Sequence, residues 1–221
     1  MAHRTRLKIC CIASIAEAQA AIEIGADALG LVGRMPSGPG VIDDDLIREI
    51  ASSVPPPIGT FLLTSETEPD RVVEHARTTG VSTVQIVDDA VTRGVHEALR
   101  AELPMVRVVQ VIHVVGEESV GKAIAAAPMV DSILLDSGNP SAATPEFGGT
   151  GRVHDWSLSR AIVEAVDRPV FLAGGLNTEN VTEAVRKVRP FGVDLCSGVR
   201  TNGSLDRVKA DSFVRALRAA I

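Results

Sequence analysis

The stretch VFLAGGLNTENVTEAVRKVRPFGVDLCSGV, residues 170–199, has the pattern of two buried strands joined by one helix. Residues 170–173 and 193–197 are short apolar runs, whereas residues 178–188 have helical spacing and end just before Pro190. Glycines follow both apolar runs, at 174–175 and at 198. Two strands connected through a helix favour parallel pairing with a right-handed crossover.

The same alternation extends over the rest of the chain and predicts the fold. Further strands are expected at residues 7–11, 28–32, 58–63, 83–87, 106–112 and 132–136. Further helices are expected at residues 15–24, 43–53, 69–79, 92–101, 117–126, 157–166 and 205–220. Together with residues 170–199, these make eight strand–helix units, so we predict a (β/α)₈ TIM barrel that occupies residues 1–221 as a single domain. A doubly wound open sheet is the alternative, and it lacks support because no GxGxxG follows the first strand.

Composition excludes several classes of partner. Apolar residues make up 45% of the chain, yet Tyr is absent and Trp occurs once, so Val, Ile, Leu and Ala must fill the core. A net charge of −6 argues against nucleic acid as the main ligand. We find no signal peptide and no apolar run of the ~18 residues that a membrane span needs. Three cysteines without the spacing of a zinc site or a disulfide framework predict a reducing, cytoplasmic location.

Paired glycine turns predict a phosphate site. Gly174 and Gly175 follow the seventh strand, and Ser197 and Gly198 end the eighth. Backbone amides in such turns can approach and bind a dianion, and barrels often hold a phosphate between the loops after strands 7 and 8. The alternative is that these glycines serve only to reverse the chain. The GGTG run at 148–151 is a further candidate for closing over the same region.

Two groups at the ends of strands predict acid–base chemistry. Cys10 lies near the end of the first strand, and Asp136 ends the apolar strand SILLD. A carboxyl group there is costly unless water or a partner meets it, and a thiolate can serve as a base. Taken singly, Cys10 fits a buried core cysteine and Asp136 fits a loop cap. Asp194, inside the eighth strand, is a further unusual charge, suited either to a bond with a neighbouring loop or to contact with a substrate.

These residues resemble those of one enzyme family. The matching motifs are KIC (8–10), GADALG (25–30), VQ (84–85), LLD (134–136), PEFGGTG (145–151), DWS (155–157), AGGLNTENV (173–181), RPFGVD (189–194) and SGV (197–199). They resemble phosphoribosylanthranilate isomerase of tryptophan biosynthesis, from residue 7 to the end of the chain.

The resemblance implies a reaction and roles for residues. The family converts N-(5′-phosphoribosyl)anthranilate to 1-(2-carboxyphenylamino)-1-deoxyribulose 5-phosphate by an Amadori rearrangement. By similarity, Asp136 is the general acid and Cys10 the general base, and no metal or organic cofactor is needed. Arg34 and Gln85 are the predicted substrate-binding residues. The expected partner is a small phosphorylated sugar, without nucleic acid or membrane, and the expected state is a monomer or homodimer.

Three positions depart from the family pattern. Cys11 replaces a glycine, Gly40 stands where an arginine binds the anthranilate carboxylate, and Val87, followed by Asp88, replaces a histidine. Arg34 is the expected substitute for the lost arginine. The departures leave two alternatives open: a diverged isomerase of another phosphorylated pentose, or a non-catalytic protein that binds phosphosugars.

Overall fold

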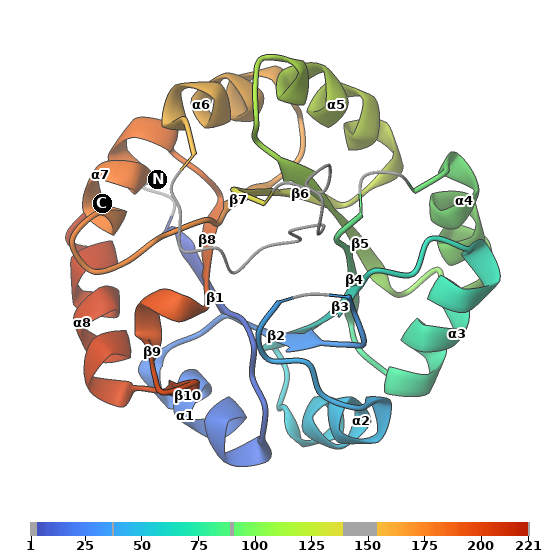
Figure 1. Cartoon of the computed structure of the whole chain (residues 1–221), viewed down its shortest axis with the longest axis horizontal. Coiled ribbons are helices and arrows are strands. Elements are labelled where there is room, and N and C mark those ends of the chain that lie inside the picture. The colour runs from blue at the N-terminus through green and yellow to red at the C-terminus, as the bar shows by residue number, and fades with distance from the viewer. Residues whose placement is uncertain (1–3, 37, 89–90, 139–153, 221) are drawn as a thin grey trace.

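The computed structural model describes residues 4–36, 38–88, 91–138 and 154–220, in which eight parallel strands close into a barrel with helices around it (Figure 1). The closure joins β1 to β8, so that residues from the two ends of the chain lie side by side. The elements are, in chain order, β1 (Arg6–Ile9), α1 (Ile15–Ile24), β2 (Ala28–Val32), α2 (Asp44–Ser53), β3 (Gly59–Thr64), α3 (Pro69–Thr79), β4 (Thr83–Ile86), α4 (Arg93–Glu102), β5 (Arg107–His113), α5 (Glu118–Ala126), η1 (Ala127–Met129), β6 (Ser132–Asp136), α6 (Trp156–Ala165), β7 (Val170–Leu172), α7 (Val181–Val188), β8 (Gly192–Leu195), η2 (Ser197–Val199), β9 (Arg200–Thr201), β10 (Ser204–Leu205) and α8 (Arg207–Arg218). The predicted barrel is confirmed.

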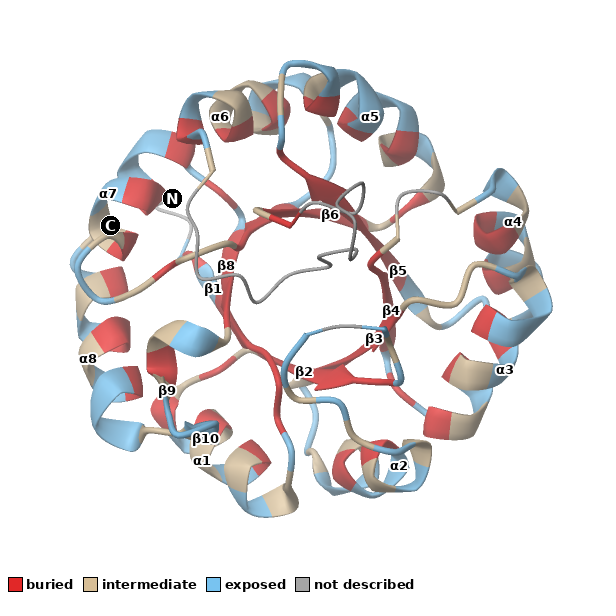
Figure 2. Ribbon diagram, in the orientation of Figure 1, coloured by how far each residue is buried: buried red, intermediate tan, exposed pale blue. Residues whose placement is uncertain are grey.

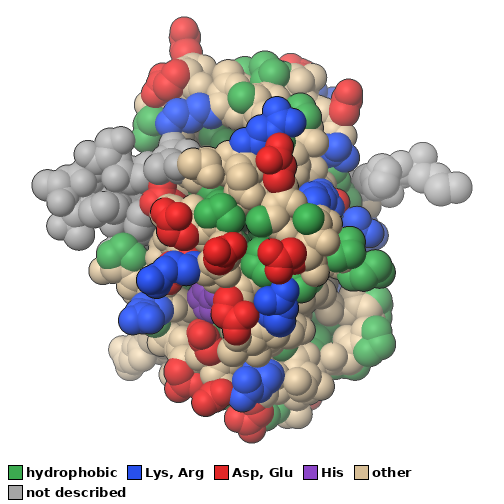
Figure 3. All heavy atoms as spheres, turned by 90° about the vertical axis from the view of Figure 1, so that its right-hand side faces the viewer, with side chains coloured by type: hydrophobic (Ala, Val, Ile, Leu, Met, Phe, Trp, Pro, Cys, Tyr) green, Lys and Arg blue, Asp and Glu red, His purple; other side chains and the backbone are tan. Residues whose placement is uncertain are grey.

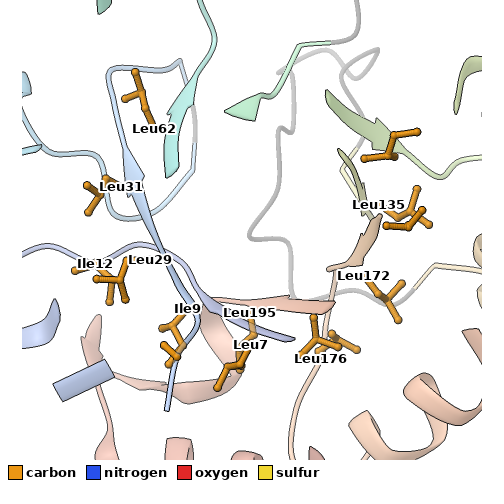
Figure 4. Packing of buried hydrophobic residues seen from close by; sticks show 14 of the residues in the cluster. Leu7, Ile9, Ile12, Leu29, Leu31, Leu62, Leu135, Leu172, Leu176 and Leu195 are labelled. Carbon is orange, nitrogen blue, oxygen red and sulfur yellow. The ribbon is translucent and has the colours of Figure 1, made fainter. Parts of the chain in front are cut away.

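Alternation along each strand divides the core into two apolar layers. One set of side chains packs between the strands and the helices, and Figure 4 shows Leu29, Leu31, Leu135 and Leu172 of this layer. The other set fills the inside of the barrel, and its members are Cys10, Cys11, Ala28, Val32, Phe61, Leu63, Val87, Val109, Val111, Leu134, Phe171 and Ala173. Because both faces of every strand are covered, the strands are buried almost throughout (Figure 2).

Two predicted boundaries are wrong for a local reason. The first strand ends at Ile9 rather than Cys11, because Cys11 has a φ of 63° and cannot continue an extended chain. The seventh helix begins at Val181 rather than at residue 178. The Asn177 side chain accepts hydrogen bonds from the amides of Glu179 and Asn180, which form a separate turn before the helix. The hairpin of β9 and β10 was not predicted.

The described surface carries charges of both signs. Figure 3 shows acidic and basic side chains interspersed over the face turned toward the viewer. Within the described residues, no helix has the length and apolar character needed to cross a membrane. The predicted closing run at 148–151 lies outside the described residues.

Candidate active site

Cys10 and Asp136 both belong to the inner face of the barrel at the carboxyl ends of the strands. Cys10 follows β1 directly and is 6% exposed; Asp136 is the last residue of β6 and is 8% exposed. Cys10 packs in the inner apolar cluster, and so does Leu134, two positions before Asp136 on the same face of β6. Active sites of this fold lie at this end of the barrel.

A buried ion pair lies on the β1–β8 seam. Lys8 Nζ is 2.8 Å from Asp194 Oδ2, and the two residues are register partners across the closing strands. Lys8 Nζ also lies 5.3 Å from the centre of the Phe61 ring. Burial opposes the charge of Lys8, but attraction to Asp194, and then to Cys10, outweighs it and raises the pKa of Lys8. Asp194 is therefore the counter-ion of Lys8 rather than the partner of a neighbouring loop.

The environment of Asp136 favours its protonated form. Burial raises the pKa of this carboxyl, and the nearby charge of Asp194 acts in the same direction. The Ser137 amide, which donates to Asp136 Oδ1 at 2.7 Å, and the neighbouring His113 act in the opposite direction without overcoming it. His113 is the register partner of Asp136 on β5, and its Nε2 lies 2.9 Å from the Val87 carbonyl oxygen. A protonated Asp136 can donate a proton into the mouth of the barrel.

A second buried pair holds the turn that carries Cys10. Arg200 Nη2 donates to the carbonyl oxygens of Cys10 at 3.1 Å and of Cys11 at 2.5 Å. Arg200 Nη1 is also 3.1 Å from Glu17 Oε1, and both side chains are largely buried. Glu17 also belongs to the first turn of α1, where its amide donates to the Ser14 hydroxyl oxygen at 3.1 Å. The role of Arg200 was missed, since nothing in the sequence links it to residues 190 positions away.

The two glycine turns pack against each other. Gly174 and Gly175 have φ values of 82° and 63°, which favour glycine. A Cβ on Gly198 would overlap the Leu176 carbonyl oxygen, so the loop after β8 rests directly on the loop after β7. Asn180 Nδ2 donates to the Gly175 carbonyl oxygen at 2.9 Å and fixes the turn. Within the described part of the chain, neither the Gly174 nor the Gly175 amide donates a hydrogen bond to another residue.

The two predicted substrate-binding residues lie in different places. Gln85 is in the interior of β4, 3% exposed, and its Oε1 has no hydrogen-bond partner among the described residues. Arg34 is exposed and lines a surface groove with Asp44 of α2 and His75 of α3. These helix residues lie outside the strands, so the structure does not bring Arg34 together with Cys10 and Asp136. Its contact with a substrate carboxylate stays a prediction.

Two of the departures from the family pattern form one feature. A Cβ on Gly40 would lie 2.5 Å from Cys11 Cβ, so the Cys11 side chain occupies the space that any side chain at position 40 would enter. Gly40 also has a φ of 77°, which favours glycine. The third departure, Val87, is buried in the inner cluster. Cysteine at 11 and the absence of a side chain at 40 are therefore mutually dependent.

The chain is similar to known proteins over almost its whole length. Residues 7–216 match the family model described as N-(5'phosphoribosyl)anthranilate (PRA) isomerase. A protein of Methanosarcina mazei named N-(5'-phosphoribosyl)anthranilate isomerase 2 is 38% identical, over 95% of this chain and 92% of its own. The N-(5'-phosphoribosyl)anthranilate isomerase of Haloferax volcanii is 39% identical, over 98% of this chain and 92% of its own.

Solved structures agree with this similarity. N-(5'-phosphoribosyl)anthranilate isomerase from Pyrococcus furiosus superposes with a TM-score of 0.80 at 27% identity, over 97% of this chain and 99% of that one. A phosphoribosyl anthranilate isomerase in complex with reduced 1-(o-carboxyphenylamino)-1-deoxyribulose 5-phosphate superposes with a TM-score of 0.76 at 27% identity, over the same shares of the two chains.

Proposed function

The chain belongs to the N-(5′-phosphoribosyl)anthranilate isomerase family, and from this premise we propose that it converts N-(5′-phosphoribosyl)anthranilate to 1-(2-carboxyphenylamino)-1-deoxyribulose 5-phosphate, with Asp136 and Cys10 transferring the protons. The observation that carries the proposal is the placement of a buried carboxyl, whose pKa is raised, and a thiol at the same end of a barrel with this family's sequence. The comparisons do not favour the alternatives of another phosphopentose or a non-catalytic protein.

Asp136 acts first, as the general acid. It gives its proton to the ribose ring oxygen, the bond between that oxygen and the anomeric carbon breaks, and the sugar opens to a protonated Schiff base. The raised pKa of the buried carboxyl supports this role, because the group must carry a proton near neutral pH. His113, on the neighbouring strand, acts against the rise in the pKa of Asp136 without overcoming it.

Cys10 acts second, as the general base. Its thiolate takes the proton from C2 of the open sugar, the electrons of that C–H bond move toward the protonated imine, and the resulting enolamine tautomerises to the ketone. Support comes from the Arg200 contact with the Cys10 carbonyl oxygen, which fixes the turn on which the thiol stands. Each proton transfer contributes a factor of ~10²–10⁴ to the rate.

The amides of Gly174, Gly175, Ser197 and Gly198 hold the substrate phosphate in this proposal. Support comes from the direct packing of the two loops and from the Gly174 and Gly175 amides, which donate to no other described residue. Because α7 begins only at Val181, six residues after Gly175, the proposed donors to the phosphate are the amides of the turn rather than those of the helix end. Oriented amides of this kind bind anions without a net positive charge.

Gln85 and Arg34 are proposed for the rest of the substrate. The buried, unpartnered Gln85 Oε1 supports a hydrogen bond to a ligand inside the barrel. Arg34 has a long, exposed side chain on the loop after β2. Its proposed role is to bind the substrate carboxylate, and the Arg34→Ala variant tests that role. A monomer or homodimer in the cytoplasm remains the expected state of the protein.

A fluorescence assay tests the proposed function. N-(5′-phosphoribosyl)anthranilate is generated in the cuvette, and its fluorescence should decay when the purified chain is added. Asp136→Asn and Cys10→Ser should each lower kcat by about 10²-fold or more while the proteins stay folded. Arg34→Ala should raise KM and leave kcat nearly unchanged. Full turnover in both Asp136→Asn and Cys10→Ser would rule out the assigned mechanism.

A further inference from the structure

Three cysteines converge where the barrel closes. Cys10 and Cys11 follow β1, and Cys196 follows β8, its partner strand. The Sγ atoms of Cys11 and Cys196 lie 2.6 Å apart although the residues are 185 positions apart in the chain. Non-bonded atoms usually approach no closer than about 3.5 Å, so these two sulfurs are already nearer to bonding distance than to ordinary contact.

The backbone of Cys11 indicates that its side chain has a use. Its φ of 63° is in the left-handed region, which glycine adopts freely and a cysteine adopts at a cost. Gly40, opposite, has no side chain in the space that Cys11 occupies. A strained residue persists where the surrounding structure supports it, and such residues cluster at functional sites. Glycine at position 11 would remove the strain, yet the chain carries a thiol there.

We infer that Cys11 and Cys196 form a reversible disulfide that joins the carboxyl ends of β1 and β8 and lowers the activity of the enzyme. The inferred loss of activity rests on the proposed function, in which Cys10 is the base; the disulfide itself does not. The oxidant is a low-molecular-weight disulfide, R–S–S–R, of the kind that exchanges with protein thiols.

The exchange begins at Cys196. This residue is partly exposed, whereas Cys10 and Cys11 are buried. A hydrogen bond with Cys11, aided by the charge of Arg200, lowers the pKa of the Cys196 thiol despite its burial. The Cys196 thiolate attacks one sulfur of R–S–S–R, the S–S bond breaks, and RS⁻ leaves. Exposed thiolates beside a positive group are the reactive ones.

The exchange ends at Cys11. Its thiol gives up its proton to RS⁻, its sulfur attacks Cys196 Sγ in the mixed disulfide, and the second RS⁻ leaves and takes a proton from solvent. Two cysteine thiols are thereby oxidised, and one R–S–S–R is reduced to two R–SH. The sulfurs need to approach by only about half an ångström, since 2.6 Å already separates them and a disulfide bond is ~2.05 Å long.

The disulfide would change the surroundings of Cys10. In the reduced protein, a hydrogen bond with Cys10, and next one with Cys196, raise the pKa of the Cys11 thiol, so Cys11 keeps its proton beside the proposed base. A sulfur in a disulfide carries no proton and cannot donate to Cys10. Oxidation therefore removes the hydrogen-bond donor beside the proposed base, and we expect slower removal of the C2 proton.

Peptide mapping after oxidation tests the disulfide. The full-length protein is incubated with oxidised glutathione, alkylated, and digested without reduction. We expect a peptide that links Cys11 to Cys196 and disappears with dithiothreitol. The linkage should persist in Cys10→Ser and be absent from Cys11→Gly, which also removes the backbone strain. A link through Cys10, or glutathione that stays on Cys196 without closure, would overturn the inference.

Activity measured on the same samples tests the switch. Oxidation should lower kcat about tenfold in the unsubstituted enzyme, reversibly, and leave Cys196→Ser at the rate of its untreated form. An oxidised enzyme that contains the link and turns over at full rate would contradict the switch. If instead the proposed function is wrong, the reduced enzyme shows no isomerase activity, whereas the linked peptide still forms.

Discussion

Asp136 is a carboxyl group kept in an apolar strand at a cost to stability. Its pKa in the folded protein lies above the ordinary value of 3.8, chiefly because of burial. The folded state therefore holds this proton more tightly than the unfolded state does. As pH rises from 3.8 through the folded pKa, the folded state loses stability relative to the unfolded state. The reason is that the unfolded chain releases this proton at a lower pH than the folded protein does.

The Asp136→Asn variant should show this cost directly. Above the folded pKa, the neutral amide should raise the free energy of unfolding, and so stabilise the fold, by about 1–3 kcal/mol, while turnover is lost. Below pH 3.8 the advantage should vanish, because the native carboxyl is then neutral in both states. Urea denaturation from below pH 3.8 up to pH 8 measures the difference. An advantage that grows as the pH falls would contradict the assigned direction.

Cys11 and Gly40 should behave as one unit. Gly40→Ala should destabilise the protein by about 2–4 kcal/mol, because its φ of 77° disfavours a Cβ and because that Cβ meets Cys11. In a Cys11→Gly background the contact is gone and only the φ penalty remains, so the cost should fall by about 1–2 kcal/mol. Denaturation of the four proteins gives the coupling. An equal cost in both backgrounds would show that the two positions are independent.

Single residues could be predicted from sequence where the position in a strand decided their direction. Cys10 and Asp136 were placed at the inner mouth because Cys10 lies near the end of one apolar strand and Asp136 ends another. The partners of Lys8 and Arg200 could not be predicted, since each contact joins positions more than 180 residues apart. Arg34 was predicted to bind the substrate only because it lies close to Gly40 in the sequence. Closeness in sequence does not determine on which side of a loop a side chain lies.

Local capping chemistry determined how well whole elements could be predicted. The ranges of α1, α3, β2 and β6 were predicted to the residue, with Gly25 and Gly80 in left-handed conformations ending the two helices. The predicted start of α7 is three residues too early. The side-chain oxygens of Asn177 and Asn180 each accept a hydrogen bond from the other residue's amide, and this turn precedes the helix. The β9–β10 hairpin is too short for a periodic pattern.

The seam between β1 and β8 contains the buried Lys8–Asp194 pair. Removing one partner leaves a buried charge, so Lys8→Met and Asp194→Leu should each destabilise the protein by about 3–5 kcal/mol. The double variant should be more stable than the sum of the two losses predicts, by about 2 kcal/mol or more, because it buries no unpaired charge. Urea denaturation of the full cycle measures this. Strictly additive losses would mean that the pair does not hold the seam.

At the scale of the whole molecule, the barrel brings together residues from both ends of the chain. Strand–helix alternation was enough to predict eight parallel strands, and closure then places the loop after β1 beside the loop after β8. Closure of the barrel places the proposed base, the two glycine turns and the Cys11–Cys196 contact at the carboxyl ends of the strands, around the mouth of the barrel. The assignment of residues 1–221 to one domain stays a prediction, as do the individual roles of the site residues.

A crystal structure with reduced 1-(o-carboxyphenylamino)-1-deoxyribulose 5-phosphate tests the central claim most directly. The account predicts the phosphate within hydrogen-bond distance, about 3 Å, of the amides at 174–175 and 197–198. It also predicts the Cys10 Sγ and an Asp136 carboxyl oxygen on either side of the ribulose carbons. A phosphate bound elsewhere, or a ribulose chain out of reach of either group, would contradict it.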